Sequence, residues 1–161
     1  MREPISRYGI AHVGYVVADS EAAVKRLSML YDIQDWLYVE FKPLSAVNNG
    51  VETDKCYLRC VLSLPDKGTR LEVIEPVSEG VHMDILREGV QTISHICHVV
   101  DDYESCRDAW LAKETNLVFE AELEDKKKGY LRCCYVYDPV LKTLLEISGK
   151  WHFREGTVGK L

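Results

Sequence analysis

The sequence predicts an α+β fold in which two βαβββ modules pair their curved sheets around a shared cavity. Two observations support this prediction. The chain contains an internal repeat, and each copy has the same order of elements, namely a strand, a helix and three further strands. Such a module has a helix on only one face of its sheet, so two modules set edge to edge can close most of a barrel around their open faces.

The repeat is clearest in two strands that each carry a histidine. The stretches IAHVGYVVAD and ISHICHVVDD align without a gap, so that His12 matches His95. His98, in the second stretch, has no histidine counterpart in the first. Because side chains alternate between the two faces of a strand, His95 and His98 point in opposite directions. We expect His12 and His95 to face the cavity and His98 to face a helix.

A helical pattern follows each histidine strand. Asp19 or Ser20 can cap the first helix and Asp102 the second, and apolar residues then recur at helical spacing. A short helix around Met83–Glu88, before Gly89, is expected to link the two copies.

Three strands complete each copy. The first of them is WLYVEF, 36–41, in one copy and LVFEAEL, 117–123, in the other. Tyr-Leu-Arg-Cys then recurs at 57–60 and 130–133, and each copy continues through a turn with Pro and Asp into a strand with a central glutamate. Segment 42–54 is interpreted as a long loop, and Lys126 to Lys128 as a hairpin tip. We expect one domain, 1–161, made of a module at 7–80, a module at 90–148 and a C-terminal tail at 149–161.

The composition is that of an ordinary globular protein, with 47% hydrophobic and 29% charged residues and a formal net charge of −6. This charge gives no reason to expect a nucleic acid or an anionic membrane as partner. No stretch approaches the length of a membrane span, and the first residues lack the apolar core of a signal peptide, so we expect a cytoplasmic protein. The cysteines lie in apolar segments without CxxC spacing, which favours buried thiols; they are Cys56, Cys60, Cys97, Cys106, Cys133 and Cys134.

Strand alternation places one histidine and one glutamate of each copy in the cavity. The four side chains expected there are those of His12, Glu72, His95 and Glu146. Two carboxylates buried together repel each other unless protons or a cation neutralise them. A divalent ion such as Ni, Co, Zn, Mn or Fe would do this and keep open coordination positions, while the absence of sulfur argues against a closed structural zinc site.

The segments IAHVGYVVADSEAAVKRL, TRLEVIEP, ISHICHVVDD and YDPVLKTLLEIS resemble the signature strands of the vicinal oxygen chelate superfamily, which contains glyoxalase I, methylmalonyl-CoA epimerase, extradiol dioxygenases and bleomycin-resistance proteins. The resemblance implies paired βαβββ modules and a metal held by the four cavity residues. LEVIEP and SHICHVVDD look most like methylmalonyl-CoA epimerase, whereas Glu72 is similar to bacterial glyoxalase I. The stretches LSMLYDIQDW and KPLSAVNNGVETD depart from both, and they border the substrate in relatives.

The leading hypothesis is therefore a metal-dependent isomerase, epimerase or lyase that removes a proton alpha to a carbonyl. By resemblance, Glu146 is the first candidate for the base, with Glu72 or Glu52 returning the proton. The implied substrate is a small carbonyl compound such as an acyl-CoA or a thiol adduct, and the resemblance implies a homodimer. Tyr57, Arg59, Tyr130 and Arg132 either orient an anionic substrate or are structural strand residues.

Two alternatives stay open. His12, His95 and Glu146 alone form a two-histidine, one-carboxylate set suited to an Fe(II)-dependent dioxygenase, although Glu72 leaves less room for substrate and oxygen. Some relatives are drug-resistance-type proteins that only bind a small molecule, and these characteristically lose the metal residues.

Overall fold

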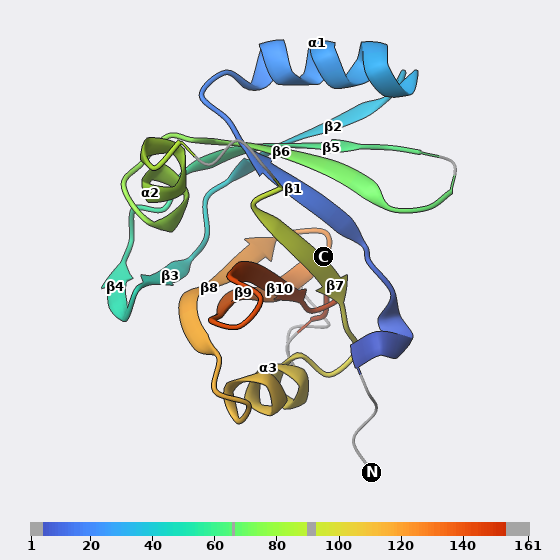
Figure 1. Ribbon diagram of the computed structural model, residues 1–161. Helices are drawn as coiled ribbons and strands as arrows, with labels where there is room; N and C mark the ends of the chain where they lie inside the picture. Colours follow the sequence, from blue (N-terminus) through green and yellow to red (C-terminus); the bar gives the residue numbers. More distant parts are fainter. Residues whose placement is uncertain (1–4, 66, 90–92, 154–161) are drawn as a thin grey trace.

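The computed structural model describes residues 5–65, 67–89 and 93–153 (Figure 1). The described residues form one curled sheet of ten strands, ordered β2-β5-β6-β1-β7-β10-β9-β8-β3-β4, together with three α-helices. The elements are β1 (His12–Val16), α1 (Ser20–Tyr31), β2 (Trp36–Phe41), β3 (Ser45–Asn48), β4 (Val51–Thr53), β5 (Leu58–Ser63), β6 (Arg70–Pro76), α2 (Val81–Arg87), β7 (His95–Val99), α3 (Tyr103–Leu111), β8 (Asn116–Asp125), β9 (Gly129–Asp138) and β10 (Thr143–Ser148).

The strand order contains the two predicted modules side by side. The first copy supplies β2-β5-β6-β1 and the second supplies β7-β10-β9-β8. The copies meet where β1 pairs antiparallel with β7, while β1 with β6 and β10 with β7 are parallel pairs. This arrangement confirms the α+β fold. The predicted module boundary at residue 90 and the tail from residue 154 onward lie outside the described residues.

Each module buries one helix against the outer face of its half of the sheet (Figure 1). Val24 of α1 packs with Val61 and Val73, and Tyr103 of α3 packs with Ile147. Both predicted N-caps are confirmed, because the side chain of Asp19 accepts from the Ala22 N–H, and that of Asp102 accepts from the Ser105 N–H. These caps fix where each helix leaves its histidine strand.

Segment 42–54, predicted to be a long loop, instead contains the hairpin β3–β4, so the prediction of a loop was wrong. β3 pairs with β8 of the second copy, which carries the chain from one edge of the sheet to the other. The signal for this hairpin is Asn49-Gly50, whose φ angles of 48° and 80° are both positive, as a type I′ turn requires. The strands on either side are only four and three residues long, too short for alternation to stand out.

The inner face of the sheet is divided into a filled end and an open end. At the filled end, Val81 of α2 and Ala46 of β3 pack with Phe119 and Tyr135 in one hydrophobic cluster. Helix α2 is the short helix predicted around residues 83–88, and it begins two residues earlier and ends one residue earlier than predicted. The open end holds a cavity of about 810 Å³, which is bordered by His12.

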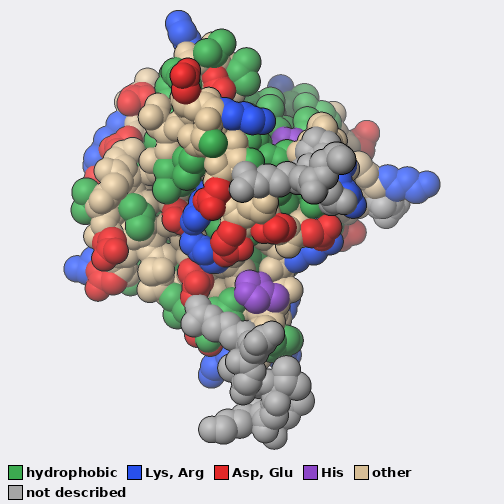
Figure 2. Space-filling model, turned by 90° about the horizontal axis from the view of Figure 1, so that it is seen from below, with side chains coloured by type: hydrophobic (Ala, Val, Ile, Leu, Met, Phe, Trp, Pro, Cys, Tyr) green, Lys and Arg blue, Asp and Glu red, His purple; other side chains and the backbone are tan. Residues whose placement is uncertain are grey.

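Charged side chains of both signs share the surface. Figure 2 shows Asp and Glu beside Lys and Arg on the face that it presents, with hydrophobic side chains between them. Among the described residues, no helix has the length and apolar character that crossing a membrane requires.

Candidate metal centre

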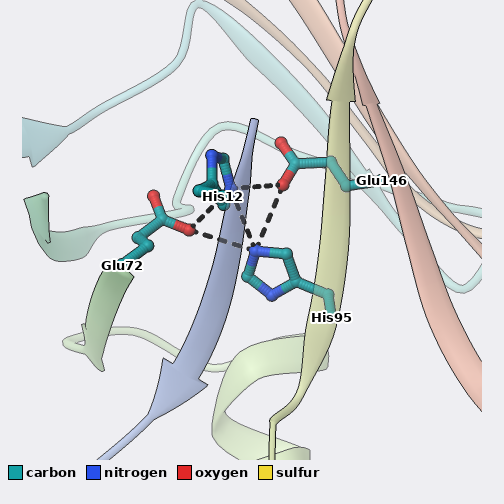
Figure 3. A group of neighbouring side chains, drawn as sticks. All are labelled: His12, Glu72, His95 and Glu146. Carbon is teal, nitrogen blue, oxygen red and sulfur yellow. Dashed lines mark hydrogen bonds and ion pairs between the residues drawn. The ribbon is translucent and has the colours of Figure 1, made fainter. Parts of the chain in front are cut away.

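The four residues predicted to share the cavity converge from four adjacent strands (Figure 3). His12 lies on β1, Glu72 on β6, His95 on β7 and Glu146 on β10, and these strands stand next to one another as β6-β1-β7-β10. The register aligns Gly14 with both Glu72 and His95, and Cys97 with both His12 and Glu146. Neighbouring strands at matched levels therefore bring the side chains together.

The four side chains present a compact set of ligand atoms. The His12 and His95 Nε2 atoms are 3.2 Å apart. Glu72 Oε2 lies 3.2 Å from His12 Nε2 and 3.1 Å from His95 Nε2. Glu146 Oε2 lies 3.1 Å from His12 Nε2 and 3.2 Å from His95 Nε2. All four atoms are within 4.8 Å of one another.

These separations fit a divalent transition-metal ion. Metal bonds of roughly 2.0 to 2.2 Å to histidine nitrogen and carboxylate oxygen place neighbouring ligand atoms about 3.0 to 3.5 Å apart. The separations of 3.1 to 3.2 Å fall in that interval. Two imidazoles and two carboxylates form a donor set that suits Ni, Co, Zn, Mn or Fe. His12, Glu72, His95 and Glu146 could therefore hold one such ion.

The centre is buried, and its charges depend on one another. Burial disfavours the charged forms, but hydrogen bonds and charge attraction across the centre outweigh it. They lower the pKa of Glu72 and Glu146 and raise the pKa of His95 to about 9. They also raise the pKa of His12, together with a hydrogen bond that the protonated His12 ring donates to Cys97. The two carboxylates thus need compensating positive charge, which two imidazolium protons or one divalent ion can supply.

The ring of His95 is held by groups that the sequence reasoning missed. The Ser94 hydroxyl donates to the Gly14 carbonyl at 2.9 Å, so its oxygen is free to accept from His95 Nδ1–H at 3.1 Å. In the neutral ring, which carries its proton on Nδ1, Nε2 is then the nitrogen that can bind a metal ion at the centre. Tyr135 stacks on His95 with ring centroids 4.9 Å apart, and its hydroxyl contacts His82 Nε2 at 3.1 Å. A serine preceding a cavity histidine was the available signal for Ser94, whereas Tyr135 and His82 had none.

Gly14 leaves the space in which His95 lies. A Cβ added at Gly14 would be 1.9 Å from His95 Cε1 and 2.4 Å from Nε2, closer than any real contact. The two residues are paired across β1 and β7, so the ring lies over the glycine backbone. In the repeat, Gly14 corresponds to Cys97, whose thiol forms a hydrogen bond with His12. The His95 ring occupies the space that a side chain at position 14 would need, whereas the Cys97 side chain has room beside His12.

The remaining sequence candidates lie away from the four-residue group. Glu52 is exposed on β4, where it pairs with Val47 of β3. Arg59 forms an ion pair with Glu75, and Arg132 forms ion pairs with Glu104 and Glu120.

The two candidate tyrosines, Tyr57 and Tyr130, show no common role. The Tyr130 hydroxyl donates to Glu124 at 3.0 Å, and Tyr57 is exposed. His98 faces α3 as predicted, because its ring contacts Trp110 edge-on. Of the two histidines in ISHICHVVDD, His95 is therefore the one at the centre.

Comparison with known proteins supports the resemblance. The family model described as the Glyoxalase/Bleomycin resistance protein/Dioxygenase superfamily matches residues 11–135. This range contains His12, Glu72 and His95, whereas Glu146 lies beyond it and is brought to the centre by β10. A search of curated proteins gives no significant match.

Solved structures share the fold at low identity. Methylmalonyl-CoA epimerase from Mycobacterium tuberculosis has a TM-score of 0.62 and 19% identity over 89% of each chain. A variant of the Streptomyces coelicolor epimerase in complex with 2-nitronate-propionyl-CoA has a TM-score of 0.59 and 17% identity, over 88% of this chain and 96% of that one.

The solved structures with this fold also include an enzyme with a different name and a longer chain. A variant of 4-hydroxymandelate synthase from Streptomyces coelicolor has a TM-score of 0.58 and 13% identity over 90% of this chain. The present chain spans about half of that protein, 49% of its length. At these identities the structural likeness establishes the fold alone. The family match over most of the sequence, together with this fold, shows that the chain belongs to the glyoxalase, bleomycin resistance protein and dioxygenase superfamily.

Proposed function

We propose that this protein is a metal-dependent isomerase, epimerase or lyase that transfers a proton at the carbon alpha to a carbonyl group. The observation that carries the proposal is the compact group of two imidazoles and two carboxylates beside a cavity of about 810 Å³. A divalent ion held there would act as a Lewis acid that polarises the substrate carbonyl and stabilises the enolate.

The two glutamates suit proton transfer because of their places around the centre. Glu72 and Glu146 stand on either side of the two imidazoles (Figure 3), and each contacts both imidazoles through Oε2. Oε1, the other carboxylate oxygen of each glutamate, is therefore available to accept a proton from the substrate. We assign proton removal to Glu146 and proton return to Glu72.

An acyl-CoA ester or a thiol adduct is the proposed substrate type. Two considerations support it, namely the sequence resemblance to methylmalonyl-CoA epimerase and glyoxalase I, and the epimerase structure solved with an acyl-CoA analogue. We also propose a homodimer in the cytoplasm. All six cysteines lie among the described residues, where they are buried and form no disulfide, which suits a reducing compartment.

The second candidate function is an Fe(II)-dependent dioxygenase that uses His12, His95 and Glu146. The specific observation in its favour is that these three side chains alone supply the two imidazoles and one carboxylate that such enzymes use. Glu72 weighs against it, because this fourth carboxylate contacts both imidazoles and so occupies a further coordination position. A protein that only binds a small molecule would have no need of four converging ligands.

Solvent deuterium exchange tests the proposal. Protein loaded in turn with Ni, Co, Zn, Mn or Fe is incubated in D2O with a panel of acyl-CoA esters and thiol hemiacetals, and deuterium at the alpha carbon is measured by mass spectrometry. We expect exchange in the wild type and its loss in Glu146→Gln, with the metal content of both proteins measured in parallel. Oxygen uptake by the Fe(II) form without alpha exchange would favour the dioxygenase.

A further inference from the structure

The cavity beside the metal centre is not symmetric, although the repeat is. Arg70 and Leu144 hold equivalent positions, because each stands two residues before the glutamate of its copy. Leu144 packs against the hydrophobic cluster at the filled end of the inner face. Arg70 lines the open cavity. Of these two equivalent residues, therefore, Arg70 borders the cavity and Leu144 does not.

Arg70 is tied closely to the centre by the sheet. It is the register partner of His12 in the parallel pair of β6 and β1, and its N–H donates to the Ala11 carbonyl at 3.0 Å. Residues two apart on a strand share a face, so Arg70 lies on the same face of β6 as Glu72. Neighbouring strands are roughly 4.8 Å apart. The Arg70 backbone is thus one strand away from His12, a proposed metal ligand.

Other charged side chains of the cavity already have partners. Lys42 pairs with Glu40 at 2.8 Å, and Glu124 accepts from the Tyr130 hydroxyl at 3.0 Å. Asp125 accepts from the Lys128 N–H at 2.9 Å. Lys128 has its ammonium over the ring of Trp151, 5.7 Å from the ring centroid.

Arg70 differs from these groups. Within the described part of the chain, its guanidinium has neither an ion pair nor a side-chain hydrogen bond, although it borders the same cavity. A guanidinium offers a planar fork of N–H donors that matches a carboxylate in two parallel hydrogen bonds. Its position and free donors make it a ready anion-binding group next to the reacting atoms.

We propose that Arg70 is a specificity-determining residue that binds a carboxylate of the substrate while the substrate carbonyl lies at the metal centre. This inference rests on the proposed function and narrows its substrate to carbonyl compounds with a nearby carboxylate, such as malonyl-type thioesters or 2-oxo acids. Two anchor points fix the orientation of the alpha carbon between them, so that its hydrogen meets one glutamate.

Ligand binding to the cobalt-loaded protein tests this role independently of turnover. Malonate, which offers one carboxylate to the ion and one to Arg70, is compared with acetohydroxamate, which chelates an ion without a second carboxylate. Both are titrated into wild type, Arg70→Gln, Arg70→Lys and Lys67→Gln, with binding read from the cobalt absorption spectrum. Lys67→Gln removes the same charge from an exposed residue outside the cavity lining.

In Arg70→Gln we expect malonate binding to weaken roughly tenfold to hundredfold, as for the loss of a charged hydrogen bond, with acetohydroxamate binding unchanged. Arg70→Lys should retain part of the malonate affinity, and Lys67→Gln should match the wild type. Equal malonate binding in Arg70→Gln and wild type would overturn the inference, as would equal weakening of both ligands.

The proposed function is read separately, from alpha-carbon deuterium exchange by the wild type. Malonate discrimination by Arg70 without exchange on any substrate would refute the proposed reaction and leave the anion site standing. Exchange by the wild type, together with malonate binding that does not depend on Arg70, would support the proposed reaction and refute the anion site. A wild type that binds neither cobalt nor malonate would overturn both.

Discussion

Replacing Gly14 by alanine should disturb the metal centre through a single methyl group. The added Cβ would lie 1.9 Å from His95 Cε1, whereas real Cβ contacts essentially never fall below 3.0 Å, so the ring must move by about 1 Å. It has little room to do so, because His95 is only 1% exposed, stacks on Tyr135 and is hydrogen-bonded to Ser94.

The magnitude follows from this geometry. Overpacking of a filled site destabilises a protein by roughly 1 to 3 kcal/mol, so Gly14→Ala should lower the free energy of unfolding by that amount. A displacement of about 1 Å is also a large fraction of a metal–nitrogen bond of roughly 2.0 Å. We therefore expect the affinity for Co(II) or Ni(II) to fall by at least the 10- to 100-fold that loss of ligand orientation brings.

Chemical unfolding and calorimetric metal titration measure the two effects. Gly149→Ala is the matched control, since a Cβ there meets its nearest atom, Tyr103 Cβ, at 3.4 Å. A second pair of variants isolates the cause. In the His95→Ala background the ring is absent, so adding Gly14→Ala should change stability by less than about 0.5 kcal/mol. The same destabilisation with and without the His95 ring would refute the steric reasoning.

Three further predictions concern groups around the centre. Ser94→Ala removes the hydroxyl that accepts from His95 Nδ1–H, so metal affinity should fall roughly 10- to 100-fold by calorimetry; unchanged affinity would contradict the assigned tautomer. Burial lowers the pKa of His82 to about 4, so the unfolded chain takes up a proton on this residue before the folded protein does, and stability should drop by roughly 3 kcal/mol as pH falls from 6.5 towards 4. Urea unfolding at several pH values should show a shallower fall in His82→Gln, and parallel curves would mean that folding does not lower the pKa of His82. Phe119→Ala should cost roughly 3 to 5 kcal/mol, because Phe119 is 1% exposed in the cluster that fills one end of the inner face; a loss below 1 kcal/mol would show that this cluster is not tightly packed.

The four residues of the centre could be predicted from the sequence because each type of residue occurs at the same position in both copies of the repeat. One histidine on a strand has several ordinary explanations, but His12 and His95 at matched positions, with a glutamate in each copy, define a common face through strand alternation. The structure brings all four side chains together, with Glu146 arriving from outside the region that the family model covers.

Features that break the repeat could not be predicted in the same way. The hairpin β3–β4 has no counterpart in the second copy, and it pairs with β8, a strand about 70 residues further along the chain. The stacking of Tyr135 on His95 also joins residues that no local pattern connects. Arg70 was not singled out, because its significance lies in the lack of a partner, which only the arrangement of its neighbours reveals.

Titration of the metal-free protein with Co(II), followed in the visible and near-ultraviolet spectrum, tests the central claim most directly. We expect saturation at one ion per chain, a spectrum of nitrogen and oxygen ligation, and loss of high-affinity binding in His12→Ala and Glu72→Ala. A sulfur-to-cobalt charge-transfer band would place the ion on cysteines such as Cys97, and a flat titration would mean that the four side chains neutralise one another without a metal.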